Sequence, residues 1–297
     1  MIRLPDESDN SLALADWVEL SLLVSSNDVL RISDAEIVGE LTDAALDAEG
    51  DRGNIAAEIA RRSAILGDVY PFFRDGQGFS VNENWREQLP YAFLLLLSSN
   101  QYYGELVYAG AANQPAKLFE YVSGQALASY VEGRFIRIGA SREAPLPAPF
   151  GEAVQYASQQ LLEESTYGQV EVQVGGDDGC DIMAWREFRD NRPGQIVIFG
   201  QCAIGTDWRD KRSELDLELW SKHINWHVRP TTAFCIPFVH EFGGTWRETS
   251  ARGGVIFDRL RLAEQLQEGF SEELVVAVGT WCDQRLVTVT ELSLEEA

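Results

Sequence analysis

The chain has 297 residues, of which 45% are hydrophobic and 10% aromatic, and its formal net charge is −23. This length and apolar content can bury one large core or two smaller ones, which excludes a chain that is disordered as a whole. The charge argues against a simple nucleic-acid binder, because a negatively charged surface repels the phosphate backbone.

Residues 1–145 are predicted to form a helical N-terminal domain. The first ten residues, MIRLPDESDN, lack the apolar region of a signal peptide, so we expect a cytoplasmic protein. Apolar residues recur at helical spacing over 13–62, and Ser33 and Asp34 are placed to cap a helix. The apolar run at 91–97 predicts a buried helix and is far shorter than the about 20 residues that cross a bilayer, so no membrane association is expected.

A proline-rich connector with Pro145, Pro147 and Pro149 places the domain boundary between residues 145 and 146. After it, the sequence predicts a helix from Phe150 to about Gly168, strands at 182–188 and 195–203, a helix from Asp207 to about His223, and a strand at 232–239. This order is typical of an α/β sandwich, so the fold class is α/β, or α+β over the whole chain. Residues 255–267 predict a C-terminal helical extension, and 274–292 fit a strand or a helix.

The negative charge is concentrated at the two ends of the chain. Residues 1–75 carry a net −10 and residues 263–297 a net −7, which leaves −6 for the middle. Acidic ends suit docking to basic partner subunits, although a solvated surface that keeps the protein soluble is the commoner role. Between residues 185 and 212 the balance reverses, with Arg186, Arg189, Arg192, Arg209, Lys211 and Arg212 against Glu187, Asp190, Asp207 and Asp210.

The most specific pattern is a glycine-rich acidic turn, GGDDGCD at residues 175–181, followed by one strand and then by a second strand that ends on QCA at 201–203. The pattern resembles the PD-(D/E)XK nuclease superfamily, and within it the Mrr-like restriction endonucleases, over residues 150–240. Those proteins combine a helix glutamate, a G-D-x-G-x-D turn and a Q-x-K strand end. The resemblance implies a restriction-endonuclease-like core that hydrolyses DNA with Mg²⁺ or Mn²⁺. A tight turn with no role in catalysis also explains the glycines, but it does not explain Asp181.

Hydrolysis of a phosphodiester needs a hard divalent cation, which prefers oxygen ligands. The resemblance implies that Asp181 bridges to the metal, that Gln201 offers its amide oxygen, and that the backbone carbonyl of Cys202 adds a further ligand. Glu152 stands in the first turn of the helix after Phe150, near the place of the family's helix carboxylate. An acid at a helix N-terminus is also favourable on electrostatic grounds alone, so both roles stay open for Glu152.

The sequence departs from the family at Ala203, where the family has a lysine. The predicted replacement is Lys211 on the following helix, and Arg209 and Arg212 are predicted to bind the scissile phosphate. An exposed helix with charge pairs such as Lys211 and Glu214 is the alternative. Four tryptophans near this region are candidates for base stacking, although large aromatic side chains more often fill cores: Trp185, Trp208, Trp220 and Trp226.

A zinc site is a weaker hypothesis. The four cysteines form no CxxC pair, and we expect reduced thiols at Cys180, Cys202, Cys235 and Cys282. Cys235 and the three histidines, His223, His227 and His240, have no spacing that is typical of zinc ligands.

Three functions stay open. The first is a metal-dependent DNA endonuclease, a restriction or anti-phage defence effector that acts with protein partner subunits or as a homodimer. The second is a degenerate nuclease fold that binds nucleic acid or scaffolds a defence complex without cutting. The third is an acidic interaction protein whose surface charge is itself the function.

Overall fold

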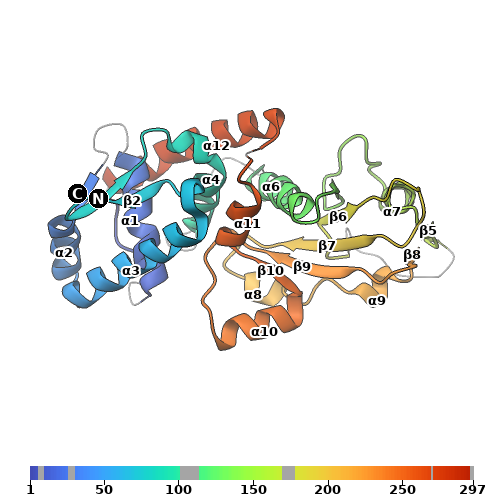
Figure 1. Cartoon of the computed structure of the whole chain (residues 1–297), viewed down its shortest axis with the longest axis horizontal. Coiled ribbons are helices and arrows are strands. Elements are labelled where there is room, and N and C mark those ends of the chain that lie inside the picture. Colours follow the sequence, from blue (N-terminus) through green and yellow to red (C-terminus); the bar gives the residue numbers. More distant parts are fainter. Residues whose placement is uncertain (6–9, 26–30, 101–113, 169–177, 269, 295–297) are drawn as a thin grey trace. The chain divides into compact units, whose positions relative to one another are not determined.

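The computed structural model describes residues 1–5, 10–25, 31–100, 114–168, 178–268 and 270–294 (Figure 1). Over these ranges the chain has an α/β fold with a mixed sheet. It divides into two compact units: unit 1 comprises residues 1–115, 237–241 and 259–297, and unit 2 comprises 116–236 and 242–258. Within the described ranges, every helix is either too short or too polar to span a bilayer.

This division differs from the boundary expected between residues 145 and 146. The chain enters unit 2 at Ala116. The reason is that strand β4 (Arg134–Arg137), which precedes the prolines, pairs antiparallel with β6 (Ile182–Arg186) and so belongs to the same sheet. The C-terminal segment expected to extend the second domain belongs instead to unit 1.

Unit 1 is a group of helices with a small antiparallel sheet in the order β1-β3-β2. The sheet was not predicted, because its strands are only three or four residues long. The helix expected over 91–97 is confirmed by α4, and the cap at Ser33 by reciprocal hydrogen bonds between Ser33 and Glu36. The elements are α1 (Ser11–Ser25), β1 (Arg31–Ser33), α2 (Asp34–Asp43), α3 (Ala48–Leu66), η1 (Gly67–Val69), β2 (Phe72–Arg74), β3 (Gly78–Val81), η2 (Trp85–Gln88), α4 (Leu89–Ser98), α11 (Arg259–Gln265) and α12 (Glu272–Leu294).

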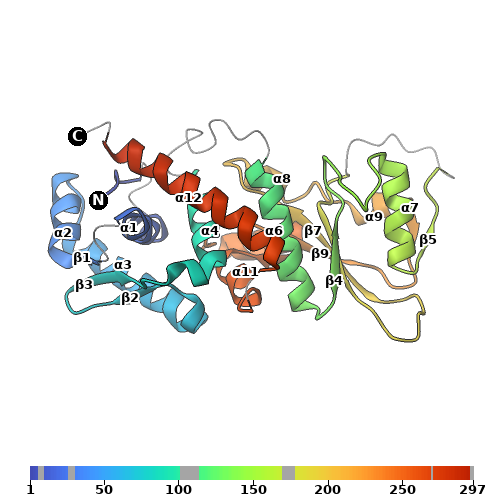
Figure 2. The same cartoon turned by 90° about the horizontal axis from the view of Figure 1, so that it is seen from above.

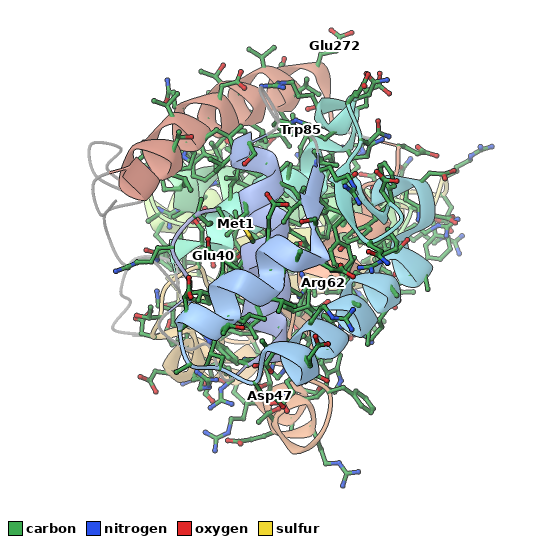
Figure 3. The ribbon with its side chains drawn as sticks, turned by 90° about the vertical axis from the view of Figure 1, so that its left-hand side faces the viewer. Met1, Glu40, Asp47, Arg62, Trp85 and Glu272 are labelled. Carbon is green, nitrogen blue, oxygen red and sulfur yellow. The ribbon has the colours of Figure 1, made fainter. Side chains whose placement is uncertain are left out.

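Helix α1 runs through the middle of unit 1 and is apolar nearly all round, as a fully buried helix must be. Two acids, Asp16 and Glu19, are buried on it at successive turns. Buried carboxylates need cationic partners. Two arginines that are themselves buried provide them, Arg62 of α3 (Figure 3) and Arg259 of α11.

The geometry of this buried ion network is tight. Arg259 Nη1 and Nη2 bind both oxygens of Asp16 at 2.8 and 2.7 Å, and Arg62 Nη1 donates to Glu19 Oε1 at 2.9 Å. Tyr91 donates to Glu19 Oε2 at 2.8 Å. Burial raises the pKa of Asp16, but Arg259 and Arg62 outweigh it and leave that pKa below its usual value. For Glu19 burial dominates, and its pKa is raised.

We predict that Arg259→Ala lowers the free energy of unfolding by about 3–5 kcal/mol, because it leaves the Asp16 carboxylate buried without its bidentate partner. Urea denaturation followed by tryptophan fluorescence measures this change. Arg86→Ala is the control, since Arg86 pairs with Asp283 at the surface and its loss should cost at most about 1 kcal/mol. Equal losses in the two variants would contradict the prediction.

Unit 2 is built on a five-stranded sheet in the order β10-β9-β7-β6-β4, in which β4, β6 and β7 are antiparallel, and β9 and β10 run parallel to β7 (Figures 1 and 2). A two-stranded sheet joins β5 and β8. The elements are α6 (Gln114–Tyr130), β4, α7 (Phe150–Gln160), β5 (Glu164–Ser165), β6, β7 (Ile196–Cys202), α8 (Trp208–Lys211), α9 (Leu217–Trp220), β8 (Ile224–Asn225), β9 (Thr231–Cys235), α10 (Gly244–Gly253) and β10 (Val255–Phe257).

Several predicted elements of unit 2 are confirmed, namely the strands β6, β7 and β9 and the start of the helix at Phe150. The predicted end of that helix near Gly168 is wrong, because α7 ends at Gln160 and residues 164–165 pair with β8. The single helix predicted from Asp207 to about His223 is wrong. It is replaced by α8 and α9, because Asp216 accepts hydrogen bonds from the backbone N–H groups of Glu218 and Leu219 and so starts a new helix. Residues 255–257 form a strand and not a helix, since they pair with β9.

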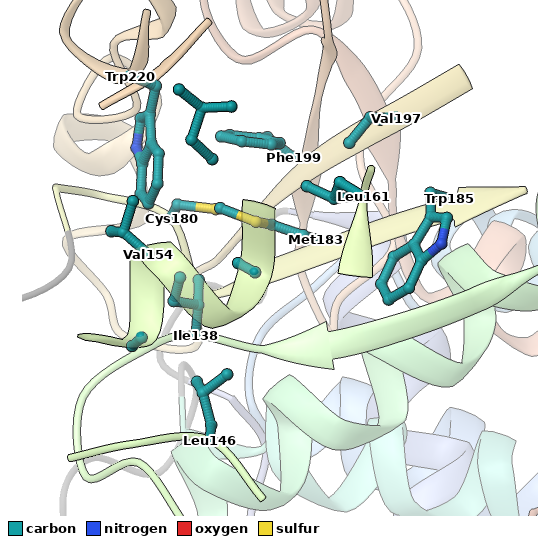
Figure 4. Packing of buried hydrophobic residues seen from close by; sticks show 13 residues of the cluster. Ile138, Leu146, Val154, Leu161, Cys180, Met183, Trp185, Val197, Phe199 and Trp220 are labelled. Carbon is teal, nitrogen blue, oxygen red and sulfur yellow. The ribbon is translucent and has the colours of Figure 1, made fainter. Parts of the chain in front are cut away.

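Helices contact both faces of this sheet. On one face, Ala153, Val154 and Ala157 of α7 pack against strand residues such as Met183 and Phe199 (Figure 4). On the other face lies α6, because a Cβ at Gly200 of β7 would meet Leu127 of α6 at 2.7 Å. These two faces are called here the α7 face and the α6 face.

Candidate active site around Asp181

Asp181 lies where β6 begins, at a β-bulge. Ile182 is the residue paired with Gly200 of β7, yet the backbone N–H of Asp181 also donates to Gly200 O, at 3.0 Å. Two residues of one strand thus oppose one residue of the other, which redirects the side chain of the extra residue. The Asp181 carboxylate accepts a hydrogen bond from the backbone N–H of Cys202, at 2.7 Å.

A second carboxylate, Glu120 of α6, comes close to Asp181 at Gly139. A Cβ on Gly139 would lie 2.9 Å from Glu120 Oε2 and 3.0 Å from Asp181 Oδ1. The two acids therefore converge on the α6 face at a position that only glycine leaves open. Arg137 of β4 forms an ion pair with Glu120, and its side chain is buried.

Gln201 does not share this site. It follows Gly200 on β7, so its side chain points to the α7 face, as do those of Val197 and Phe199. There its amide nitrogen donates to Glu214 at 3.0 Å. The expectation that Asp181 and Gln201 hold one cation together with their side chains is wrong, because the bulge turns Asp181 to the α6 face and leaves Gln201 on the other.

Cys202 is the residue of β7 that lies beside Asp181. Burial, followed by interactions with Cys235, Asp181 and Glu120, raises the pKa of the Cys202 thiol well above its usual value. The sulfur therefore stays protonated near neutral pH and is a poor metal ligand. The metal-ligand role expected from the sequence was assigned to the backbone carbonyl of Cys202, and it stays a prediction.

The other predicted site residues lie elsewhere on unit 2. Glu152 is exposed on α7, whose buried residues pack on the α7 face, so it does not join Asp181. Lys211 is half-buried in α8, and Arg209 is exposed. Arg212 is held by Arg209 O and by Thr249. Ala203 is buried, with 1% of its surface exposed.

Asp178, in the acidic turn, is held by contacts with α9 and with the residues that follow it. Its carboxylate is 2.8 Å from His223 Nε2, and both side chains are buried. Its backbone carbonyl accepts from Trp220 Nε1 at 3.2 Å. The turn is therefore attached to the end of α9, whereas Gly175, Gly176 and Asp177 of the same motif lie outside the described residues.

The zinc hypothesis has no support in the described ranges, where no three His, Cys, Asp or Glu side chains are grouped as a metal site would need. His223 contacts Asp178, and His227 contacts Glu163. Of the tryptophans proposed to stack on bases, Trp185, Trp208 and Trp220 are buried.

Comparison of the chain with protein-family models, with curated proteins and with solved structures found no match. The resemblance to nucleases therefore rests on the residues of this sequence.

Glu120 was missed by reasoning from the sequence. The family pattern directed attention to the helix just before the acidic turn, which is α7. The helix that lies against the Asp181 carboxylate is α6, before β4. Only the strand order would have indicated this, since β4 pairs with β6 and brings α6 with it.

We predict that Gly139→Ala disturbs the acid pair more than it disturbs the fold. The added Cβ meets the ends of two flexible side chains, which can move apart at little cost. Any activity that needs both carboxylates should fall at least about tenfold, a typical effect of displacing a metal-site group, while the melting temperature stays close to that of the parent. Gly39→Ala is the matched control, because a Cβ there meets nothing within 4 Å. A large loss of stability in Gly139→Ala would refute this prediction.

His223→Ala should lower the free energy of unfolding by about 2–3 kcal/mol, since it leaves the Asp178 carboxylate buried without its side-chain partner. The double variant with Asp178→Ala should lose less than the two single variants together, because the unpaired carboxylate is gone. Denaturant unfolding of the three variants measures the coupling. Additive losses would mean that the two side chains do not stabilise each other.

Proposed function

We propose that unit 2 is a metal-dependent DNA endonuclease core of the restriction-endonuclease-like α/β sandwich type, working as a restriction or anti-phage defence effector with partner subunits. The observation that supports the proposal is that the carboxylates of Asp181 and Glu120 lie close together, beside the backbone of Cys202. Two carboxylates that lie next to one glycine repel each other, so neither folding preference nor core packing explains why they are there.

The donor set fits Mg²⁺ or Mn²⁺ better than Zn²⁺. Magnesium is usually held by one or two carboxylates and keeps several water ligands and substrate phosphate oxygens, so it needs no cage of three protein side chains. Asp181, Glu120 and the carbonyl oxygen of Cys202 would hold it on the α6 face. When bound, the cation would polarise the phosphate and lower the pKa of the attacking water.

The residues around this set have distinct tasks in the proposal. Asp181 is oriented by the N–H of Cys202, and Glu120 by its ion pair with Arg137. Lys211 and Arg209 lie on α8 and not beside the two acids. Their contacts with the phosphates of the substrate, which the sequence predicts, stay a prediction. Gln201 acts on the opposite face by tying Glu214 to β7.

Plasmid cleavage in Mg²⁺ or Mn²⁺ tests the proposal. Asp181→Ala and Glu120→Gln should each reduce cleavage at least about 100-fold, the upper end of the loss seen for residues that only support metal ligands, and Lys211→Ala should also reduce it. Gln201→Ala should keep activity within about tenfold of the parent, below the about 10–100-fold loss typical of residues that orient metal ligands, because Gln201 contacts Glu214 on the opposite face. Lys222→Ala, which changes an exposed lysine, is the matched control for Lys211.

The pattern of losses separates this site from the one expected from the sequence. Cleavage that depends on Gln201 and not on Glu120 would overturn the proposed ligand set. Melting curves of all variants show whether a loss follows from unfolding, which matters for Glu120→Gln because it also releases Arg137.

A second candidate function is nucleic-acid binding, or scaffolding of a defence complex, without cleavage. It is favoured by Ala203, which is buried where the family has its lysine, and by the pairing of Glu120 with Arg137, which already neutralises one of the two acids. A protein that binds DNA in the presence of magnesium but leaves it intact would support this candidate over the first.

A further inference from the structure

The two acids Asp181 and Glu120 have a positive charge of the protein itself beside them, the guanidinium group of Arg137. Strand β4 brings it there, because α6 lies against β4 at Gly124, where an added Cβ would meet the ring of Phe135. Arg137 stands two residues after Phe135, so its side chain points to the same α6 face. It reaches the helix acid, and Arg137 Nε is 2.5 Å from Glu120 Oε2.

The oxygen that Arg137 binds is the one that lies toward Asp181. Glu120 Oε2 is 2.9 Å and Asp181 Oδ1 is 3.0 Å from one and the same point, the position of a Cβ on Gly139. The other oxygen of Asp181 accepts a hydrogen bond from the backbone N–H of Cys202. A cation between the two acids would therefore contact Glu120 Oε2, which is already bound to Arg137.

The guanidinium group of Arg137 is held firmly in this place. Its Nη1 donates to Ser141 O at 3.2 Å, and its Nη2 donates to Ala140 O. Its Cζ is 5.6 Å from the ring centroid of Tyr121, and only 4% of the side chain is exposed. An arginine does not lose its proton in a protein. The positive charge therefore stays near the two acids when a metal ion approaches them.

We propose that Arg137 is an autoinhibitory counter-ion, which competes with a divalent cation for Glu120 Oε2 and keeps the metal affinity of the site low. This inference rests on the proposed function and concerns the regulation of the same site. Before a metal binds, the ion pair keeps Glu120 in position. Once a metal ion arrives, the same ion pair opposes it, because two cations then share one carboxylate oxygen.

The magnitudes favour repulsion over orientation as the larger effect. One neighbouring charge changes the proton affinity of a carboxylate by about ten- to a thousandfold, and the charge of a divalent cation is twice that of a proton. The loss of a residue that orients a metal ligand weakens metal binding by about ten- to a hundredfold. The two effects have opposite signs, so the direction of the change in an Arg137 variant decides between them.

Titration with Mn²⁺ alone, without DNA, tests the proposal. The electron paramagnetic resonance signal of the free ion disappears on binding, and about pH 8 keeps the carboxylates ionised. Arg137→Gln removes the charge and keeps a polar side chain, so the Kd for Mn²⁺ should fall about tenfold or more. Arg137→Lys keeps the charge, so it should not lower the Kd.

Two controls accompany these variants. Arg134→Gln changes the net charge by the same amount on the same strand, but Arg134 pairs with Glu187 and 62% of its side chain is exposed. This variant should bind Mn²⁺ like the parent. Adding Asp181→Ala to Arg137→Gln should abolish the gain in affinity, which assigns the bound ion to the site of the two acids.

A measurement on the parent protein does not depend on the folding of a variant. The NMR signal of the Arg137 Nε–H group, assigned through the bonds of its own side chain, should shift as Mg²⁺ is added. The reason is that the cation weakens the charge-assisted hydrogen bond to Glu120. A signal that does not move while the metal binds would overturn the proposal.

The outcomes separate this inference from the proposed function. If a folded Arg137→Gln variant binds Mn²⁺ no more tightly than the parent does, the inference is wrong and Arg137 only positions Glu120, while the metal site stands. If neither protein binds Mn²⁺, the metal site itself is refuted, and the inference with it. Binding by Arg137→Gln but not by the parent would be the strongest support, because the ion pair would then exclude the metal completely.

Discussion

The bidentate ion pair between Asp16 and Arg259 is the interaction on which unit 1 depends. It joins α1 to α11, and the surrounding carboxylates, tyrosines and arginines leave neither charge without a partner. Such a cluster contributes little net stability compared with an apolar core of the same volume, but it tolerates the loss of no member. Its effect is to specify which segments pack together, because Arg259 binds both carboxylate oxygens of Asp16 with its two terminal nitrogens.

In unit 2 a single backbone irregularity has a comparable effect. The bulge at Asp181 shifts one side chain relative to the alternation of the strand, so that Asp181 joins Glu120 and not Gln201. The face of the sheet on which each of these side chains lies then decides its charged neighbours, its burial and its hydrogen bonds. The chemistry proposed for this protein thus depends on a local distortion of one strand, which is a common feature of catalytic sites on sheets.

The sequence predicted the parts of the fold that have strong periodicity or clear caps. The buried helix at 91–97, the capped helix after Ser33 and the three strands of the central sheet are of this kind. It missed the short strands, whose pairing partners are distant in sequence. The sequence indicated Asp181 because an acid just before an apolar strand conflicts with folding preference. It did not indicate Glu120, because an acid on an amphipathic helix is common and conflicts with no folding preference. Bulges have no signal in a periodic pattern, so the separation of Asp181 from Gln201 was not foreseeable.

The segments of unit 1 are separated along the chain by unit 2, and this arrangement sets an order of events during synthesis. Helix α1 leaves the ribosome early with Asp16 and Glu19, but Arg259 follows only after nearly all of unit 2. Unit 2 is almost completely synthesised before all segments of unit 1 are available, although domains more often fold in order from the N-terminus. Until Arg259 has been made, Asp16 and Glu19 on α1 lack one of their two cationic partners, so the final packing of α1 depends on a residue that follows unit 2 in the chain.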